Sequence, residues 1–173
     1  MFLENAGFKG KMPRIIAAGG RGRAFDRFCT SFNKGEPCML LVDGEGPVTG
    51  DSPWMHLKSR DGWTKPEGAE NDHCYLMVQC MEAWFFADKP KLKAFFGQGF
   101  NENALPKNQN IETIAKDEIF NALQAASKNC KSKGSYGKGD HSFDILMLIK
   151  PDLVRKASPW ADRFLSALSE RMG

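Results

Sequence analysis

The sequence predicts an α/β fold, in which an open, mostly parallel sheet has helices on both faces and a helical C-terminal part follows. Two observations lead to this prediction. Short apolar segments alternate with helical patterns in the order strand, helix, strand, long loop, strand, helix, which is typical of such sheets. The segment Pro37–Val42 is continuously apolar instead of alternating, as expected of a central strand covered on both faces.

The first elements are a short helix, a strand and a longer helix. Residues Met1–Ala6 are predicted to be the end of a helix that stops at Gly7. Pro13–Ala18 is predicted to be a short buried strand, since it is apolar and ends in two glycines. The next helix has apolar residues at the spacing of one helical face, namely Phe25, Phe28, Cys29 and Phe32.

A long connection separates the central strand from the third one. Residues Gly46–Asp72 are polar and rich in glycine and proline, yet they include Trp54 and Trp63. We therefore expect this connection to be ordered and to pack its tryptophans on the domain. A largely apolar strand is predicted for His73–Met81.

The C-terminal half is predicted to be mostly helical. Asp88 is expected to cap one helix and Asn110 a longer one. Lys131–Asp140 is expected to form a basic, glycine-rich loop, and Ser158 to open the last helix. No repeat or low-complexity tract divides the chain, so residues 1–173 are predicted to form a single domain.

Composition excludes several classes of protein. The net charge is only +3, so any contact with nucleic acid must come from a local patch. The five cysteines form no CxxC pair, which argues against a disulfide framework or a cysteine-based zinc site. No apolar run approaches the roughly 20 residues of a membrane span, and the N-terminus lacks a signal peptide. We expect a cytoplasmic protein without membrane contact.

Acidic residues follow two of the predicted strands. Asp43 and Glu45 come after the central strand, and Glu82 comes after the third. If these strands are neighbours, three carboxylates meet at one sheet edge, where Mg²⁺ or Mn²⁺ would relieve their repulsion. The alternative is that acids are common at strand ends because strands end at the surface.

A second group of polar residues lies in Tyr136–His141. Glycines on both sides of Lys138 suit a loop that approaches an anion, so Lys138 is a candidate phosphate contact. His141 is a candidate general acid, metal ligand or phosphate donor. The alternative is a surface turn with a solvated lysine and a histidine that caps the following helix.

A third candidate is the turn Gly19–Arg23, which precedes a helix as phosphate-binding turns do. A dinucleotide-binding fingerprint would need its third glycine where Phe25 stands. The simpler interpretation is a turn with solvated arginines.

Three segments, Leu40–Glu45, Met81–Phe85 and Tyr136–Phe143, together resemble a family of small bacterial and archaeal proteins of unknown function. That family is related to the Toprim domains of the OLD and RloB types. The resemblance covers nearly the whole chain, and it implies that the open sheet is Toprim-like.

The resemblance also implies a chemistry. Toprim domains hold Mg²⁺ with a glutamate after the first strand and a D-x-D pair after a later one. By resemblance, Asp43 and Glu45 are that pair, and Glu82 belongs to the Glu-x-Trp segment of the RloB-like relatives. We therefore expect a Mg²⁺-dependent phosphodiesterase or nuclease, in a phage-defence system that includes an ATPase partner.

One departure from the Toprim pattern favours an alternative. The first strand and its glutamate are absent, and Glu4 lies in the short N-terminal helix. We therefore expect a Toprim-like domain that is incomplete at its N-terminus. The alternative function is a non-catalytic partner or sensor module of an ATPase, with the fold retained as a scaffold.

Overall fold

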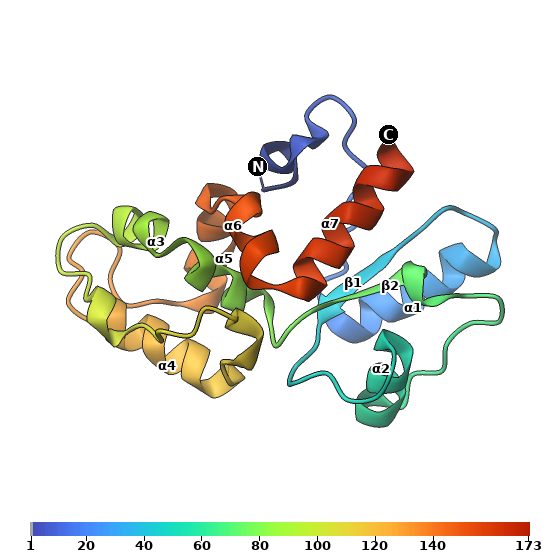
Figure 1. Ribbon diagram of the computed structural model, residues 1–173, viewed down its shortest axis with the longest axis horizontal. Helices are drawn as coiled ribbons and strands as arrows, with labels where there is room; N and C mark the ends of the chain where they lie inside the picture. Colours follow the sequence, from blue (N-terminus) through green and yellow to red (C-terminus); the bar gives the residue numbers. More distant parts are fainter. Residues whose placement is uncertain (1) are drawn as a thin grey trace.

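The computed structural model describes residues 2–173, which form a mixed α/β structure with a small parallel sheet and many helices (Figure 1). The strands are β1 (Leu40–Asp43) and β2 (Cys74–Met77). The α-helices are α1 (Arg21–Asn33), α2 (Pro53–Asp61), α3 (Lys89–Phe96), α4 (Lys116–Ser127), α5 (Lys138–Leu148), α6 (Pro151–Ala157) and α7 (Pro159–Met172). Shorter helical segments are Glu4–Phe8, Asn71–His73, Met81–Asp88, Glu102–Ala104 and Ile111–Thr113.

The sheet consists of β1 and β2, paired in parallel as the sequence predicts for these two strands. Leu40 lies opposite Cys74, and Asp43 lies opposite Met77. In a parallel pair, both carboxyl ends lie at the same edge, so whatever follows Asp43 and Met77 is brought together. A wider sheet is absent from residues 2–173.

Both faces of the sheet are covered by helices, which explains the continuous apolar pattern of β1. On one face, Val42 and Leu76 join a core with residues of α1 and α2, including Phe28 and Leu57. On the other face, Tyr75 packs on Phe164 of α7, with ring centroids 5.5 Å apart. The Gly46–Asp72 connection is ordered as expected, since Trp54 is buried on α2 and Trp63 stacks on Phe25.

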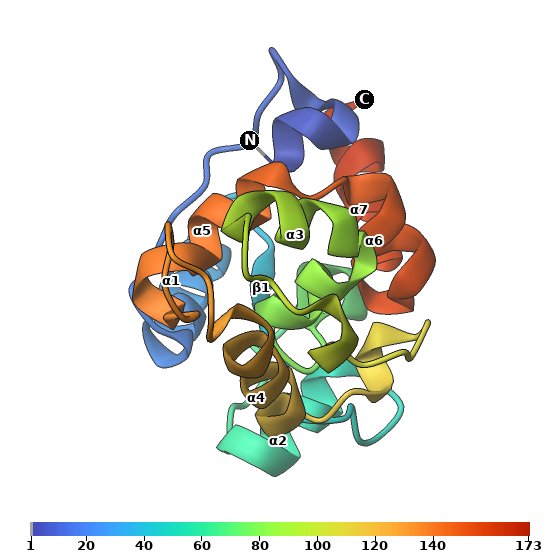
Figure 2. The same cartoon turned by 90° about the vertical axis from the view of Figure 1, so that its left-hand side faces the viewer.

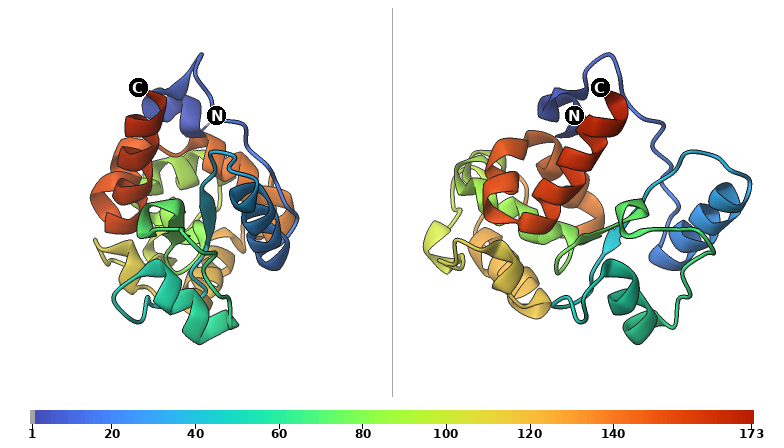
Figure 3. Two further views of the ribbon diagram at one scale, coloured as in Figure 1. Left: turned by 90° about the vertical axis from the view of Figure 1, so that its right-hand side faces the viewer. Right: turned by 45° about the vertical axis from the view of Figure 1, so that its right-hand side comes forward.

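The larger core lies in the helical half of the molecule. The 3-10 segment Met81–Asp88 runs through its centre and contacts α3, α4, α5 and α6 (Figure 2). Its residues Trp84 and Phe85 are buried, and Phe2 stacks on Trp84. The N-terminal helical segment and the end of α7 lie side by side (Figure 3). No helix within residues 2–173 is long and apolar enough to cross a membrane.

The strand predicted for Pro13–Ala18 is wrong. This segment has no regular secondary structure, and the side chains of Ile15 and Ile16 are 61% and 49% exposed. A short apolar segment becomes a strand only when a neighbouring strand takes its hydrogen bonds, and the described residues provide none here.

Further boundaries differ from the prediction. The strand predicted for His73–Met81 covers only Cys74–Met77, and Met81 already belongs to a 3-10 segment. Asn110 caps only the 3-10 turn Ile111–Thr113, and the long helix begins later, at Lys116. The basic loop is shorter than expected, because α5 already begins at Lys138. The other caps are confirmed: Asp88 accepts a hydrogen bond from Lys91 N–H, and Ser158 accepts one from Ala161 N–H.

Candidate functional site

The site is built at the carboxyl edge of the two-stranded sheet. The ladder continues past the strands, since Gly44 N–H donates to Met77 O (2.8 Å) and Glu45 N–H donates to Gln79 O (2.6 Å). Gly44 is closely packed there, because an added Cβ would lie 3.3 Å from the carbonyl oxygen of Gly46. The turn after β1 is therefore held against the chain that leads from β2 to Glu82.

Asp43 and Glu82 are brought together at this edge, as predicted. Oδ1 of Asp43 accepts a 2.9 Å hydrogen bond from Met81 N–H, the amide directly before Glu82. Burial raises the pKa of Asp43, and the charges of Glu82 and Glu45 raise it further, against the opposing effects of the Met81 hydrogen bond and Lys138. A carboxylate at the end of β1 and one in the 3-10 segment after β2 thus share one partly dehydrated environment.

Glu82 is the most unusual side chain of the site, because it is an acid with no exposed surface. Its Oε1 lies 3.3 Å from Ser142 Oγ and 3.5 Å from Tyr136 Oη, and these two hydroxyls are 2.7 Å apart. Its Oε2 has no hydrogen-bond partner among the described residues. A buried oxygen without a partner typically costs about 1–3 kcal/mol, a cost that a cation or a hydrogen-bond donor at this atom would relieve.

Lys138 forms an ion pair with Glu82. Its Nζ lies 3.4 Å from Glu82 Oε1, while the lysine side chain is 55% exposed. Burial lowers the pKa of Lys138, but the charges of Glu82 and Asp43 outweigh it and the pKa is raised overall. One lysine therefore lies near two carboxylates.

Glu45 lies close to the pair but is engaged elsewhere. Its carboxylate forms an ion pair with Lys116, and Arg60 Nη2 lies 3.6 Å from Oε2. Burial acts to raise the pKa of Glu45, yet the cations Lys116, Arg21 and Arg60 hold it below its usual value. Among residues 2–173, no group of three or more His, Cys, Asp or Glu side chains is arranged to hold a metal ion.

His141 is buried on α5, three residues after Lys138. Its Nδ1 accepts a 3.0 Å hydrogen bond from Gly137 N–H at the start of the helix. The ring packs edge-on against Phe95 and Phe96. Within the described chain, no hydrogen bond joins His141 to Asp43, Glu45 or Glu82. The histidine thus caps the helix that carries Lys138, and its Nε2 is the ring atom left for other chemistry.

Sequence comparison identifies the family to which the chain belongs. The sequence profile of a domain of unknown function (DUF4276) matches residues 4–169. The chain belongs to the DUF4276 family. No curated protein and no solved structure matches it. The family description names no activity and no link to Toprim, OLD or RloB proteins, so the residues themselves must support any function.

Arg21 fixes the start of the acidic turn in this DUF4276 protein. Its Nε donates to the carbonyl oxygen of Asp43 (2.9 Å), and its two terminal nitrogens each donate to one oxygen of Asp61 at 2.8 Å. The guanidinium also lies over the ring of Trp63, 4.9 Å from the centroid. Arg21, one of the two arginines of Gly19–Arg23, therefore holds together β1, α2 and Trp63.

His56 is a second positioning residue, which the sequence reasoning missed. Its Nδ1 accepts a hydrogen bond from Thr49 N–H (3.1 Å), so the ring proton is on Nε2, which donates to Gly44 O at 2.7 Å. The buried, neutral histidine thereby holds the Asp43–Glu45 turn from α2. No spacing in the sequence joins His56 to Gly44, because the contact depends on how α2 packs. Ser142 was also missed, although its spacing of four from Lys138 places both on one face of a helix.

Proposed function

We propose that this DUF4276 protein is a divalent-metal-dependent phosphodiesterase that acts on nucleic acid, with Asp43 and Glu82 as its metal ligands. The observation that supports this most is Glu82 Oε2, a fully buried carboxylate oxygen without a partner among the described residues, near the half-buried carboxylate of Asp43. Carboxylate oxygens are what Mg²⁺ and Mn²⁺ bind, and Mg²⁺ needs only one or two from the protein.

We also propose that the architecture is a reduced form of the Toprim-like sheet that the resemblance implies. The parallel strands, the helices on both faces and the acids at the carboxyl edge support that proposal. Glu45 is the third ligand we assign. Because Lys116 and Arg60 hold its carboxylate, Glu45 would join the metal only after exchanging these partners.

The metal, when bound, would polarise a phosphodiester and lower the pKa of bound water. The protein's own residues have separate tasks. Lys138 is half exposed beside the acids, so its ammonium is placed to pair with a substrate phosphate once the cation neutralises Glu82. His141, whose Nδ1 is an acceptor, carries its proton on Nε2 when neutral and is therefore assigned to donate a proton or a hydrogen bond.

A second candidate function is a non-catalytic partner or sensor module of an ATPase. Lys138 beside Glu82 and Lys116 beside Glu45 favour it, because both acids are already neutralised without a metal. In that role, the buried Glu82 network is structural. Capture of an ATPase by the wild-type protein, without metal-dependent hydrolysis, would decide for it.

The experiment is cleavage of labelled single-stranded DNA, duplex DNA and RNA with Mg²⁺ or Mn²⁺. Asp43→Asn and Glu82→Gln keep side-chain size and are expected to lower the rate at least about 100-fold, the usual effect of losing a group that stabilises the transition state. Glu67→Gln, an exposed acid outside the site, is the matched control. Equal cleavage by wild type and Glu82→Gln, or no cleavage with any substrate, would reject the proposal.

A further inference from the structure

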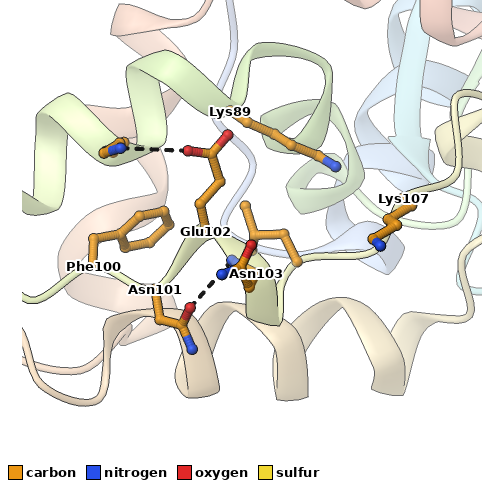
Figure 4. A pocket seen from close by; sticks show the side chains of 8 residues that line it. Lys89, Phe100, Asn101, Glu102, Asn103 and Lys107 are labelled. Atoms are coloured by element: carbon orange, nitrogen blue, oxygen red, sulfur yellow. Dashed lines mark hydrogen bonds and ion pairs between the residues drawn. The ribbon is translucent and has the colours of Figure 1, made fainter.

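A pocket separate from the acidic pair lies between α3 and the chain around Glu102–Ala104 (Figure 4). Its volume is about 410 Å³, which is enough for a small ligand. In Figure 4, Lys89 and Lys107 lie on one side of it, and Phe100 and Asn101 on the other. Glu102 and Asn103 complete the polar lining.

The pocket gathers more positive than negative charge. Lys89 and Lys93 are four residues apart and lie on the same face of α3, and Lys107 adds a third ammonium. Lys89 Nζ donates to the carbonyl oxygen of Pro106, the residue before Lys107. The only carboxylate in the lining is Glu102, whose Oε2 lies 3.7 Å from Lys93 Nζ. Three cations and one anion leave a net charge of about +2.

The other lining groups are donors and an aromatic surface. Oδ1 of Asn101 accepts from Asn103 N–H, while the side-chain NH₂ groups of Asn101 and Asn103 have no partner among residues 2–173. Lys107 likewise has none within that part of the chain. Phe100 is held in place by stacking on Phe96, with nearly parallel rings and centroids 5.4 Å apart. An oxygen-rich dianion would satisfy these donors and offset the repulsion between the lysines.

We infer that this pocket binds a phosphate monoester, the dianionic group that matches its charge and its excess of donors. The ester is either a free phosphorylated small molecule or the 5′-phosphate end of a nucleic acid. The inference does not depend on the metal pair, because none of the lining residues belongs to the acidic site. Phosphate binding at this pocket can therefore be tested independently of the proposed phosphodiesterase activity.

The test measures binding of inorganic phosphate, pyrophosphate and two oligonucleotides of one sequence, with a 5′-phosphate or a 5′-hydroxyl, by calorimetry without divalent metal. Lys107→Ala is expected to weaken phosphate binding about tenfold, the effect of losing one charge-assisted hydrogen bond. Glu102→Gln is expected to tighten binding several-fold, because it removes the only negative charge. Lys65→Ala, an exposed lysine outside the pocket, is the control.

The two oligonucleotides identify the source of the phosphate. Tighter binding of the 5′-phosphorylated strand assigns the pocket to nucleic-acid ends. Binding of phosphate and pyrophosphate, with no difference between the strands, assigns it to small phosphorylated molecules. The inference is overturned if neither phosphate nor pyrophosphate binds, or if Lys107→Ala and Lys65→Ala behave alike.

Discussion

The ammonium nitrogen of Lys138 lies 3.4 Å from Oε1 of Glu82, a carboxylate that has no exposed surface. If the proposed metal site is correct, Lys138 and a divalent cation compete for the negative charge of Glu82. Under that proposal, Lys138 stabilises the metal-free protein and weakens its binding of metal.

Replacing Lys138 by methionine is therefore expected to destabilise the metal-free protein and to tighten metal binding. The loss of the ion pair should cost about 1–3 kcal/mol, less than for a fully buried pair because the lysine is half exposed. Urea unfolding with and without Mg²⁺ measures both effects. An unchanged free energy of unfolding would show that the lysine does not stabilise the buried Glu82. If Mg²⁺ does not restore the stability of the variant, the proposed metal site is wrong.

Asp43→Asn is expected to make the protein more stable at pH 7 by about 1 kcal/mol while it weakens metal binding. The pKa of Asp43 is raised, so its ionised form is disfavoured by folding. Between the ordinary aspartate pKa and the raised one, the folded state binds more protons than the unfolded state, so stability falls as pH rises. Unfolding at several pH values measures this, and the difference between wild type and variant should shrink at acid pH. A variant less stable than wild type at pH 7 would contradict the prediction.

Arg21→Met is expected to destabilise the protein by about 1–3 kcal/mol, because it breaks the paired hydrogen bonds to Asp61. The hydrogen bond from Arg21 holds the pKa of Asp61 below its usual value. The resulting stability is present above the ordinary aspartate pKa and is lost as pH falls through the lowered one. Acid unfolding measures this loss, which should be smaller in the variant. Arg23→Met, on the exposed side of the same turn, is the control.

His56→Ala is expected to cost about 1–3 kcal/mol and to lower activity, since Gly44 O and Thr49 N–H both lose a buried partner. The measurements are thermal unfolding and the metal-dependent cleavage rate. His73→Ala is a useful comparison, because that histidine accepts from Glu70 N–H away from the acidic turn. Equal loss of activity in both variants would show that His56 does not position the site.

The exposed segment Pro13–Ala18 gives a prediction of little effect. Ile15→Ser and Ile16→Ser are expected to change the free energy of unfolding by less than about 0.5 kcal/mol, as at other exposed positions. Leu76→Ala, which removes a fully buried side chain of β2, should cost about 2–5 kcal/mol. Denaturant unfolding of the three variants measures both. A large effect of either isoleucine would mean that this segment is buried after all.

The pattern of apolar residues in the sequence predicts much of the fold. The continuous apolar residues of β1 indicated a strand covered on both faces, and parallel pairing with β2 then brought Asp43 and Glu82 together. Pro13–Ala18 shows the limit of such patterns, because its composition suits a strand but no neighbouring strand takes its hydrogen bonds. Asn110 shows another limit, since it caps a 3-10 turn rather than the helix that follows.

The details of the site were less predictable, because they depend on contacts between distant residues. Nothing local in the sequence shows that Lys116 and Arg60 engage Glu45, or that His56 holds Gly44. The position of Ser142 beside Glu82 depends on α5 beginning at Lys138. The glycine-rich composition of this segment predicts a loop there instead.

Calorimetric titration of Mn²⁺ into the wild-type protein and Glu82→Gln, without substrate, tests most directly whether Asp43 and Glu82 share a cation. We expect one ion to bind per wild-type chain and at least about tenfold weaker binding to Glu82→Gln, with Glu67→Gln unchanged. Absence of Mn²⁺ binding to the wild type, or equal binding to both proteins, would contradict the account.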